Sequence, residues 1–261
     1  MFSLIIKYIR HFFIAGHRRG RGIHSPYTFA FVNEAVFSRR NCVVPGSLIN
    51  AHRAVLKDRT PVNTGDYGAG SRVVSPGRRS ARSLARWSSV NKKTGRLLYR
   101  ISHWFRPSVI IELGTGLGIS TAYLAAGAPE ARLLSIEADW QKSDYARKLM
   151  VSLGFANVEI VTGLFDDLIA NAPECKNEKV LVFLDGNHRY DSTIRYLNHF
   201  LESASKELLM ILDDIHWSGE MERAWKEIVK LNEVRVSLDL FFLGVLIFRK
   251  DLNKEHFPVG W

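Results

Sequence analysis

A glycine-rich turn is the first part of this sequence that could do chemistry. The segment IIELGTGLGIST, residues 110–121, runs from apolar residues into Glu112 and then through Gly114, Gly116 and Gly118 at alternate positions. Such a turn between a strand and a helix is typical of nucleotide-binding sites. The spacing is not the G-x-G-x-x-G of nicotinamide-binding folds. An acid two residues before the first glycine would repel a pyrophosphate, but it suits a ligand with an ammonium or sulfonium charge.

A second acid indicates an adenosine-containing ligand. Glu137 ends the apolar run RLLSIE, which is the next strand-like run after the turn. A carboxylate at the end of a second strand can accept hydrogen bonds from both ribose hydroxyls. A similar acid-x-Gly-x-Gly cluster occurs at residues 66–74. No apolar strand precedes that cluster and no helix clearly follows it, so we interpret it as a loop.

The elements that must position these residues alternate regularly from residue 108 onward. Five apolar strand-like runs alternate with helical stretches, which predicts a parallel sheet with helices on both faces. Two further runs, residues 234–240 and 243–250, follow each other closely. Their connection is too short for a helix, so they should pair antiparallel at one edge of the sheet. The five earlier runs are residues 108–113, 132–137, 158–162, 179–185 and 207–214.

The chain before this alternation differs in charge and in pattern. Residues 1–107 hold 20 of the 36 Lys and Arg but only 3 of the 26 Asp and Glu. A basic section joined to a mildly acidic core suggests an anionic partner, namely nucleic acid, an acidic membrane surface or a phosphorylated substrate. A solvated basic surface is an equally good interpretation. Residues 1–40 and 95–105 read as helical, whereas residues 41–94 read as loops, short helices or a segment that orders only on binding.

The first fifteen residues predict an amphipathic helix with one broad apolar face. Lys7 and Arg10 lie off this face. The helix either packs on its own protein, which we favour, or lies on a membrane with its basic residues facing head groups. No small-residue cleavage site follows, so a signal peptide is not expected. The apolar face consists of Phe2, Ile5, Ile6, Ile9, Phe12 and Phe13.

Cysteine usage and hydropathy indicate the compartment. The chain has only two cysteines, Cys42 and Cys175, and they lie far apart without metal-ligand spacing. This suits a reducing compartment. No apolar run reaches eighteen residues, so no transmembrane helix is expected. We therefore expect a cytoplasmic protein, with a peripheral place on the inner face of the membrane left open.

Residues 108–249 resemble the class I S-adenosylmethionine-dependent methyltransferases, especially the catechol O-methyltransferase-like and related small-molecule branches. ELGTGLGIST is similar to the family's first motif, IEAD to its ribose-binding acid, VFLDGNHRY to its fourth-strand motif and LMILDDIHW to its fifth. The resemblance implies an α/β fold: a Rossmann-like, doubly wound, mostly parallel seven-stranded sheet with an antiparallel last strand. Residues 108–261 would form the methyltransferase domain. Residues 1–107 would form a basic, partly helical N-terminal extension that covers the substrate.

The same resemblance implies a cofactor, S-adenosyl-L-methionine, and the residues that hold it. Glu112 and the glycines would line its methionine and ribose side, and Glu137 would bind the ribose. Ser120 and Thr121 would lie near its carboxylate, and residues 163–165 would lie against the adenine ring. The implied cofactor-binding residues are Glu112, Gly114, Thr115, Gly116, Gly118, Ser120, Thr121, Glu137, Gly163, Leu164, Phe165 and Asp185.

Acidic and histidine side chains follow the fourth and fifth strands. Methyl transfer needs a nucleophile whose proton is removed or whose pKa is lowered. Asp185 and Asp214 match the two Asp ligands of the family's magnesium site, but Ile215 stands at its Asn position. With Asp213 as the substitute ligand, we expect Mg²⁺ or another divalent metal; a site completed by histidine would suit a transition metal better. Without a metal, a histidine becomes the general base. The candidate catalytic residues are Asp185, His188 and His216, and the candidate metal ligands are Asp185, Asp213 and Asp214.

The sequence LDGNHRY after the fourth strand favours a hydroxyl acceptor. Enzymes that methylate base amines carry Asn/Asp-Pro-Pro-aromatic there. The leading prediction is therefore O-methylation of a small or lipid-linked hydroxyl compound, which could be anionic. The alternative is an RNA methyltransferase that holds phosphates with its basic section. A nicotinamide-dependent oxidoreductase and a non-catalytic binding protein are less favoured. Nucleic acid is thus a disfavoured partner, whereas membrane contact through residues 1–15 and a homodimer are left open.

Overall fold

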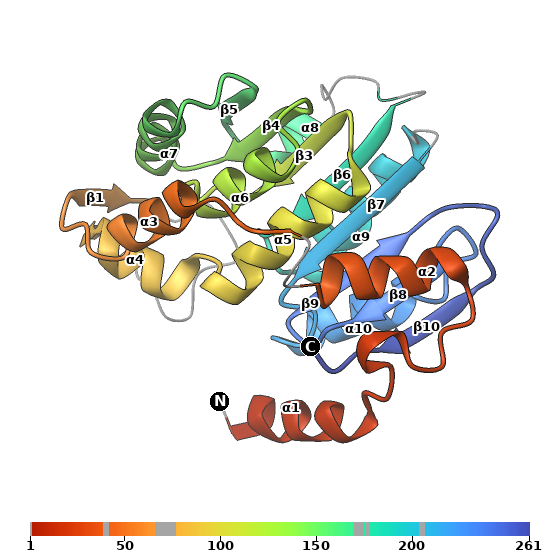
Figure 1. The fold of residues 1–261 in the computed structure, drawn as a ribbon. Coiled ribbons are helices and arrows are strands. Elements are labelled where there is room, and N and C mark those ends of the chain that lie inside the picture. The colour runs from red at the N-terminus through yellow and green to blue at the C-terminus, as the bar shows by residue number, and fades with distance from the viewer. Residues whose placement is uncertain (1, 39–41, 66–76, 170–174, 176–177, 204–206) are drawn as a thin grey trace. The chain divides into compact units, whose positions relative to one another are not determined.

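The computed structural model of the chain describes all residues except 1, 39–41, 66–76, 170–174, 176–177 and 204–206 (Figure 1). The chain divides into two compact units, residues 1–38 with 174–261, and residues 39–173. The glycine cluster at residues 66–74 lies outside the described residues.

The unit of residues 39–173 is built on three parallel strands in the order β3-β4-β5. β3 pairs parallel with β4, and β4 pairs parallel with β5. The carboxyl ends of neighbouring parallel strands share one edge, so the glycine turn, Glu137 and Gly163 lie along that edge. The elements are β3 (Val109–Leu113), α6 (Ile119–Gly127), β4 (Arg132–Glu137), α7 (Trp140–Leu153), β5 (Val158–Thr162) and α8 (Phe165–Ile169).

Helix α5 (Lys92–Phe105) packs closely against α6 because two glycines remove side chains from the contact. A Cβ atom at Gly127 would lie 2.4 Å from the carbonyl oxygen of Tyr99. A Cβ atom at Gly95 would lie 2.4 Å from the ring of Tyr123. The predicted helix at residues 95–105 is confirmed, and it begins three residues earlier than expected. Asn91 caps its first turn by accepting hydrogen bonds from the backbone N–H groups that follow.

Residues 41–94 contain more regular structure than the sequence predicted. Helices α3 (Gly46–Val55) and α4 (Ala81–Ser88) flank two short strands, β1 (Pro61–Thr64) and β2 (Gly77–Ser80). These strands pair antiparallel. The expectation of loops and short helices was therefore incomplete. Four-residue strands rich in polar residues are too short to show the alternation of apolar and polar residues on which the prediction rests.

The unit of residues 1–38 and 174–261 contains five strands in the order β10-β8-β9-β7-β6. β6 pairs parallel with β7, and β9 pairs antiparallel with both β7 and β8. β10 pairs parallel with β8. The strands are β6 (Lys179–Leu184), β7 (Glu207–Asp213), β8 (Val236–Asp239), β9 (Leu243–Ile247) and β10 (Glu255–Pro258).

The fold class is confirmed, but two details of the predicted sheet are corrected. The two strands in close succession do pair antiparallel, yet β9 lies between β7 and β8 instead of at an edge. The antiparallel strand is also not the last one, because β10 follows it and raises the strand number above the seven expected. A four-residue run that ends in proline gives almost no strand signal in a sequence.

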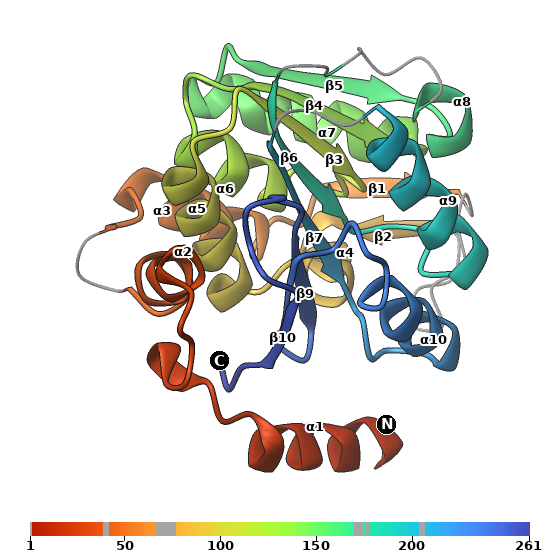
Figure 2. The same ribbon diagram turned by 90° about the vertical axis from the view of Figure 1, so that its right-hand side faces the viewer.

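Helices complete this unit, and α1 (Phe2–Ile14) lies at its border (Figure 2). The remaining helical segments are Arg18–Gly20, α2 (Pro26–Ala30), the π-helical turn Phe31–Val36, α9 (Tyr190–Glu202) and α10 (Gly219–Ile228). The predicted domain boundary at residue 107 does not coincide with a boundary of either unit. The first 38 residues group with the C-terminal strands, and residues 39–107 group with β3, β4 and β5.

The polar side of α1, and not its apolar face, contacts the rest of its unit. Lys7 forms an ion pair with Glu222 at 2.7 Å, and His11 lies 3.5 Å from Asp239. The apolar face points away from these contacts, so the packing that we favoured from the sequence is wrong for this face. Its described side chains are all at least half exposed: Ile5 55%, Ile6 53%, Ile9 50%, Phe12 61% and Phe13 81%.

Candidate functional site

The turn after β3 has a backbone conformation that glycine adopts most readily. Gly114, Gly116 and Gly118 have φ angles of 107°, 53° and 82°, a region in which a Cβ atom is strained. The N–H of Gly114 donates to the carbonyl of Ile136 on β4 at 2.9 Å. A Cβ atom at Gly116 would meet no atom within 4 Å, so the space beside the middle of the turn is open.

Glu112, at the end of β3, is a fully buried carboxylate with one oxygen left over. Its Oε2 accepts hydrogen bonds from the hydroxyls of Thr121 at 2.5 Å and Ser135 at 2.6 Å. Its Oε1 has no hydrogen-bond partner. Burial raises the pKa of Glu112, and the neighbouring hydroxyls of Ser120, Ser135 and Thr121 act against that shift. An unpartnered buried oxygen is costly, so this position suits a cationic ligand group such as an ammonium.

Glu137 ties the end of β4 to the glycine turn. Its Oε2 accepts the N–H of Gly116 at 2.8 Å, and its Oε1 accepts the N–H of Asp139 at 3.0 Å. The side chain is nearly buried. A carboxylate can accept about four hydrogen bonds. The two bonds from Gly116 and Asp139 therefore leave about two acceptor positions for a pair of ribose hydroxyls.

The third stretch implied for the cofactor follows β5. The N–H of Gly163 donates to the backbone carbonyl of Glu137 at 3.0 Å, which places Gly163 beside the end of β4. Leu164 is 49% exposed and Phe165 is half-buried at the start of α8. Apolar groups with open faces at this edge are suited to the flat side of a base.

These observations fit S-adenosylmethionine as the ligand of this edge. Every implied cofactor residue except Asp185 belongs to the unit of residues 39–173. Three features of this edge could contact the ligand. They are the unpartnered oxygen of Glu112 on β3, the open turn at Gly116 and the carboxylate of Glu137 at the end of β4. Thr115, Ser120 and Thr121 are buried around them. The assignment of individual residues to parts of the cofactor stays a prediction.

Asp185, His188, Asp213 and Asp214 form a second group, in the other unit. His188 Nε2 lies 3.7 Å from Asp185 Oδ1. Asp213 and Asp185 share a side-chain hydrogen bond. The loop after β6 and the loop after β7 both turn sharply, because Asn187 and Asp214 have positive φ angles of 51° and 56°.

The charges of this second group shift one another's protonation. Burial and then the charge of Asp214 raise the pKa of Asp213 to about 7. Burial also raises the pKa of Asp214, against the opposing effect of His188. Burial lowers the pKa of His188, against the charge of Asp214, so this histidine is neutral at pH 7. A neutral imidazole beside carboxylates can accept a proton, and the carboxylates stabilise the imidazolium that results.

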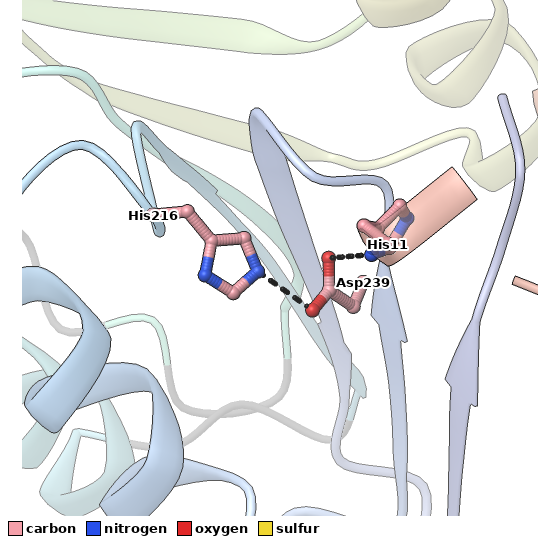
Figure 3. A group of neighbouring side chains, drawn as sticks. All are labelled: His11, His216 and Asp239. Atoms are coloured by element: carbon pink, nitrogen blue, oxygen red, sulfur yellow. Dashed lines mark hydrogen bonds and ion pairs between the residues drawn. The ribbon is translucent and has the colours of Figure 1, made fainter. Parts of the chain in front are cut away.

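His216 does not join this group, although it is only two residues from Asp214. Its Nε2 lies 2.8 Å from Asp239 Oδ2 and its Nδ1 lies 3.5 Å from Glu222 Oε1. Asp239 also faces His11 from helix α1 (Figure 3). Of the two histidines predicted as bases, His188 therefore has the surroundings of a base, and His216 belongs to a different cluster.

The predicted metal ligands do not form a three-ligand centre in this arrangement. Within the described part of the chain, one group of three side chains brings ligand atoms within 4.8 Å of one another, and it is His11, His216 and Asp239. Asp185, Asp213 and Asp214 are not such a group. Ile215, at the position of the expected third ligand, is fully buried and apolar.

Three residues near these groups were missed in the sequence. Asn187 donates from its side-chain amide to Ser192 at 2.8 Å and thereby holds the loop after β6. An Asn one residue before His188, in a Gly-Asn pair typical of tight turns, could have indicated it. His11 and Asp239 gave no usable signal, because residues 228 apart in the sequence come together only in the folded chain.

Comparison with known proteins agrees with this fold. Residues 111–215 match a protein-family model described as Methyltransferase domain. The match runs from β3 to the residue that follows Asp214, and so it includes both groups of side chains described above.

The sequence is also similar to curated proteins over part of its length. The human protein named Transmembrane O-methyltransferase is 33% identical over 97 residues, 33% of this chain and 33% of that protein. The Transmembrane O-methyltransferase homolog of Mus musculus is 31% identical over 120 residues, 41% of this chain and 46% of that protein. The chain thus spans about a third to just under half of the length of the curated relatives that it matches.

Solved structures share the fold over most of the chain. An O-methyltransferase from Bacillus cereus in complex with SAH is 18% identical, with a TM-score of 0.57, over 79% of this chain and 93% of that one. The O-methyltransferase TomG from Streptomyces achromogenes, in complex with SAM, is 17% identical with a TM-score of 0.58, over 82% of this chain and 95% of that one. At such low identity these likenesses show the Rossmann-like fold alone. Together with the family model they confirm the resemblance stated from the sequence.

Among the described residues, no helix is both long enough and apolar enough to span a bilayer.

Replacing Glu137 should test the cofactor edge. We expect Glu137→Gln to weaken binding of S-adenosylhomocysteine by about 1.5–3 kcal/mol, roughly ten- to a hundredfold, because a charged acceptor of hydrogen bonds is lost. Isothermal titration calorimetry measures the change. Glu159→Gln, at an exposed position on β5, is the matched control and should bind as the unchanged protein does. Equal affinity in both variants would contradict the assignment of Glu137 to the ribose.

Proposed function

We propose that this chain, which carries a methyltransferase domain at residues 111–215, transfers a methyl group from S-adenosylmethionine to a hydroxyl group. The acceptor that we propose is a small or lipid-linked compound. The observation that supports this most directly is the buried Glu112 carboxylate, with its orphaned oxygen beside an open glycine turn. The test is transfer of an isotopically labelled methyl group from S-adenosylmethionine to a lipid extract and to a panel of small phenols, followed by mass spectrometry.

The residues of the β3-β4 edge bind and orient the cofactor in this proposal. When bound, S-adenosylmethionine supplies a methyl group on a positively charged sulfur. Glu112 offers its free oxygen to the cofactor's positive charge, and Glu137 offers its remaining acceptor positions to the ribose hydroxyls. The protein's own hydrogen bonds already hold both carboxylates in place.

His188 is the proposed general base. The acceptor hydroxyl must lose its proton as its oxygen attacks the methyl carbon. His188 is neutral at pH 7 because burial lowers its pKa, so it can take that proton. The nearby Asp185 and the charge of Asp214 then stabilise the protonated ring. His216 lies in a different cluster, with its Nε2 hydrogen-bonded to Asp239, so we do not assign it this role.

Replacing His188 should lower turnover more than cofactor binding. We expect His188→Gln to reduce kcat about 10²- to 10⁴-fold, the usual contribution of a positioned base, with an unchanged affinity for S-adenosylhomocysteine. In the unchanged protein, kcat/KM should fall only as the pH drops below about 6.5, because the pKa of His188 is lowered from that ordinary value. This acid limb should vanish in the variant. His199→Gln on α9 is the control, and an equal loss of rate there would contradict the assignment.

Chelation tests the remaining metal prediction. The mechanism above needs no divalent ion, so we expect the labelled-methyl assay to keep its full rate after excess chelator. A rate that disappears on chelation and returns with magnesium would instead favour a divalent cation at Asp185, Asp213 and Asp214. Asp214→Asn should then abolish the recovery, because it removes one of the two acids that match the family's ligands.

We also propose a peripheral place on an anionic membrane surface, reached through α1. The apolar face of this helix is exposed. Tyr8 of the same helix and Phe242 are also exposed, and their stacked rings have centroids 6.0 Å apart. Exposed arginines lie on the helix and shortly after it in the chain, namely Arg10 on α1 and then Arg18, Arg19 and Arg21. Each basic residue near an anionic bilayer contributes about 1 kcal/mol to the free energy of membrane binding. Four arginines therefore add materially to the binding free energy that burial of the apolar face supplies.

Lys7 does not face head groups, as the sequence had suggested for a membrane-bound helix, because it is paired with Glu222. The arginines take that role in the proposal. Cys42 and Cys175 are not joined in a disulfide in the described structure, which fits the reducing cytoplasmic side of a membrane.

Vesicle flotation tests the membrane proposal. We expect the full chain to float with vesicles that contain phosphatidylglycerol, to float poorly with pure phosphatidylcholine, and to detach as salt rises. Phe13→Glu should abolish flotation. Val151→Glu on α7 is a matched control, because Val151 is also an apolar side chain and is 80% exposed. If the face instead joins two copies of the chain, Phe13→Glu would convert a dimer to a monomer in light scattering without any effect on vesicles.

A further inference from the structure

A cluster of two histidines and one carboxylate joins three separate parts of one unit. His11 comes from α1, His216 from the loop after β7 and Asp239 from the end of β8. Their side chains point toward one another (Figure 3). One ligand atom from each lies within 4.8 Å of the others. All three belong to the unit of residues 1–38 and 174–261.

Each histidine presents one nitrogen to the carboxylate and has an oxygen atom near the other nitrogen. His216 Nε2 lies 2.8 Å from Asp239 Oδ2, and its Nδ1 lies 3.5 Å from Glu222 Oε1. His11 Nδ1 lies 3.5 Å from Asp239 Oδ1, and its Nε2 lies 3.5 Å from the carbonyl oxygen of Val259. Metal-bound histidines have this arrangement, because the second nitrogen donates to a carboxylate or a carbonyl and fixes the ring.

The surroundings of the cluster restrict its movement. Asp239 accepts the N–H of Phe241 at 2.8 Å, and the ring of Phe241 packs against both histidine rings, at 5.5 Å from His11 and 5.2 Å from His216. The side chains of His11, His216 and Asp239 are only 11%, 19% and 9% exposed. Ligands that are held on rotationally restricted side chains lose little entropy when they bind an ion.

We propose that His11, His216 and Asp239 form a binding site for a zinc-like divalent transition metal. Two imidazoles and a carboxylate are a common three-ligand set for zinc, which leaves a fourth position for water. Magnesium is disfavoured, because it prefers oxygen ligands. Tetrahedral zinc with bonds of roughly 2.0–2.1 Å separates its ligand atoms by about 3.3 Å. The present separations reach that value with small rotations of the side chains.

A metal ion at this site connects α1 to β8 and to the loop after β7. The described contacts of α1 include the Lys7–Glu222 ion pair and ring contacts of Tyr8 with Phe241. A bond from His11 through the metal to Asp239 adds a fixed link one turn further along the helix. Glu222 serves both the ion pair and His216. The site therefore holds the helix whose other face is exposed, and it does so independently of methyl transfer.

Direct binding measurements on the full chain test this proposal. After the protein is stripped with chelator, isothermal titration calorimetry with Zn²⁺ should show one equivalent bound, and thermal melting should shift upward because the ligand binds the folded state. Co²⁺ should give the visible absorption bands of a tetrahedral site. His11→Gln and Asp239→Asn should abolish both signals. Glu222→Gln should weaken zinc binding by about 10- to 100-fold, as the loss of an outer hydrogen-bond partner does.

Two controls separate this site from other histidines and acids. His24→Gln, at an exposed histidine of the same unit, should bind zinc as the unchanged protein does. Asp185→Asn should also leave binding intact. Circular dichroism establishes whether each variant is folded. If Asp239→Asn does not fold, His11→Gln is the decisive variant. Zinc binding that is absent, that survives His11→Gln, or that disappears with Asp185→Asn would overturn the proposal.

Discussion

The buried carboxylate of Glu112 constrains the candidate cofactor site more than any other single group. A charge with no exposed surface is tolerated only when the protein supplies hydrogen bonds, and here Thr121 from α6 and Ser135 from β4 supply them. The carboxylate therefore joins a strand, its neighbour and the following helix at one point. Because both donors bind the same oxygen, the other oxygen stays available, and this asymmetry suits a cationic ligand.

The glycine turn follows from this constraint. The chain must pass from β3 into α6 within a few residues while Glu112 stays buried beside Thr121, and the positive φ angles of the glycines allow that path. Glu137 then fixes the turn from the outside by accepting the N–H of Gly116. Glu137 thus holds the turn itself, while Glu112 holds the start of the helix that follows it, and both acids keep acceptor positions for a ligand. The site is largely formed by residues of one unit.

The ends of β6 and β7 show how the surroundings decide the role of similar residues. His188 and His216 both follow apolar strands, and both lie close to aspartates in the sequence. Burial keeps His188 neutral beside Asp185 and Asp214, whereas Asp239 holds His216 through a hydrogen bond. Asp239 also contacts His11 of α1. This contact attaches the polar side of α1 to the unit and leaves the apolar face of the helix exposed. Asp239, at the end of β8, thereby determines the contacts of His216 and the orientation of α1.

The local features of this protein could be predicted from the sequence. The glycine turn, the acids that end β3 and β4 and the alternation of strands and helices depend on residues that are close in the chain, where steric and periodic rules act directly. The cofactor edge and the fold class follow from these features. The position of β9, the strand β10 and the hairpin of β1 and β2 could not be predicted, because pairing between short strands depends on distant partners. The amphipathic pattern of α1 was visible, but which face packs was decided by Glu222 and Asp239, more than two hundred residues away. The same distance hid the group of His11, His216 and Asp239, since side chains so far apart in sequence meet only when the tertiary structure brings them together.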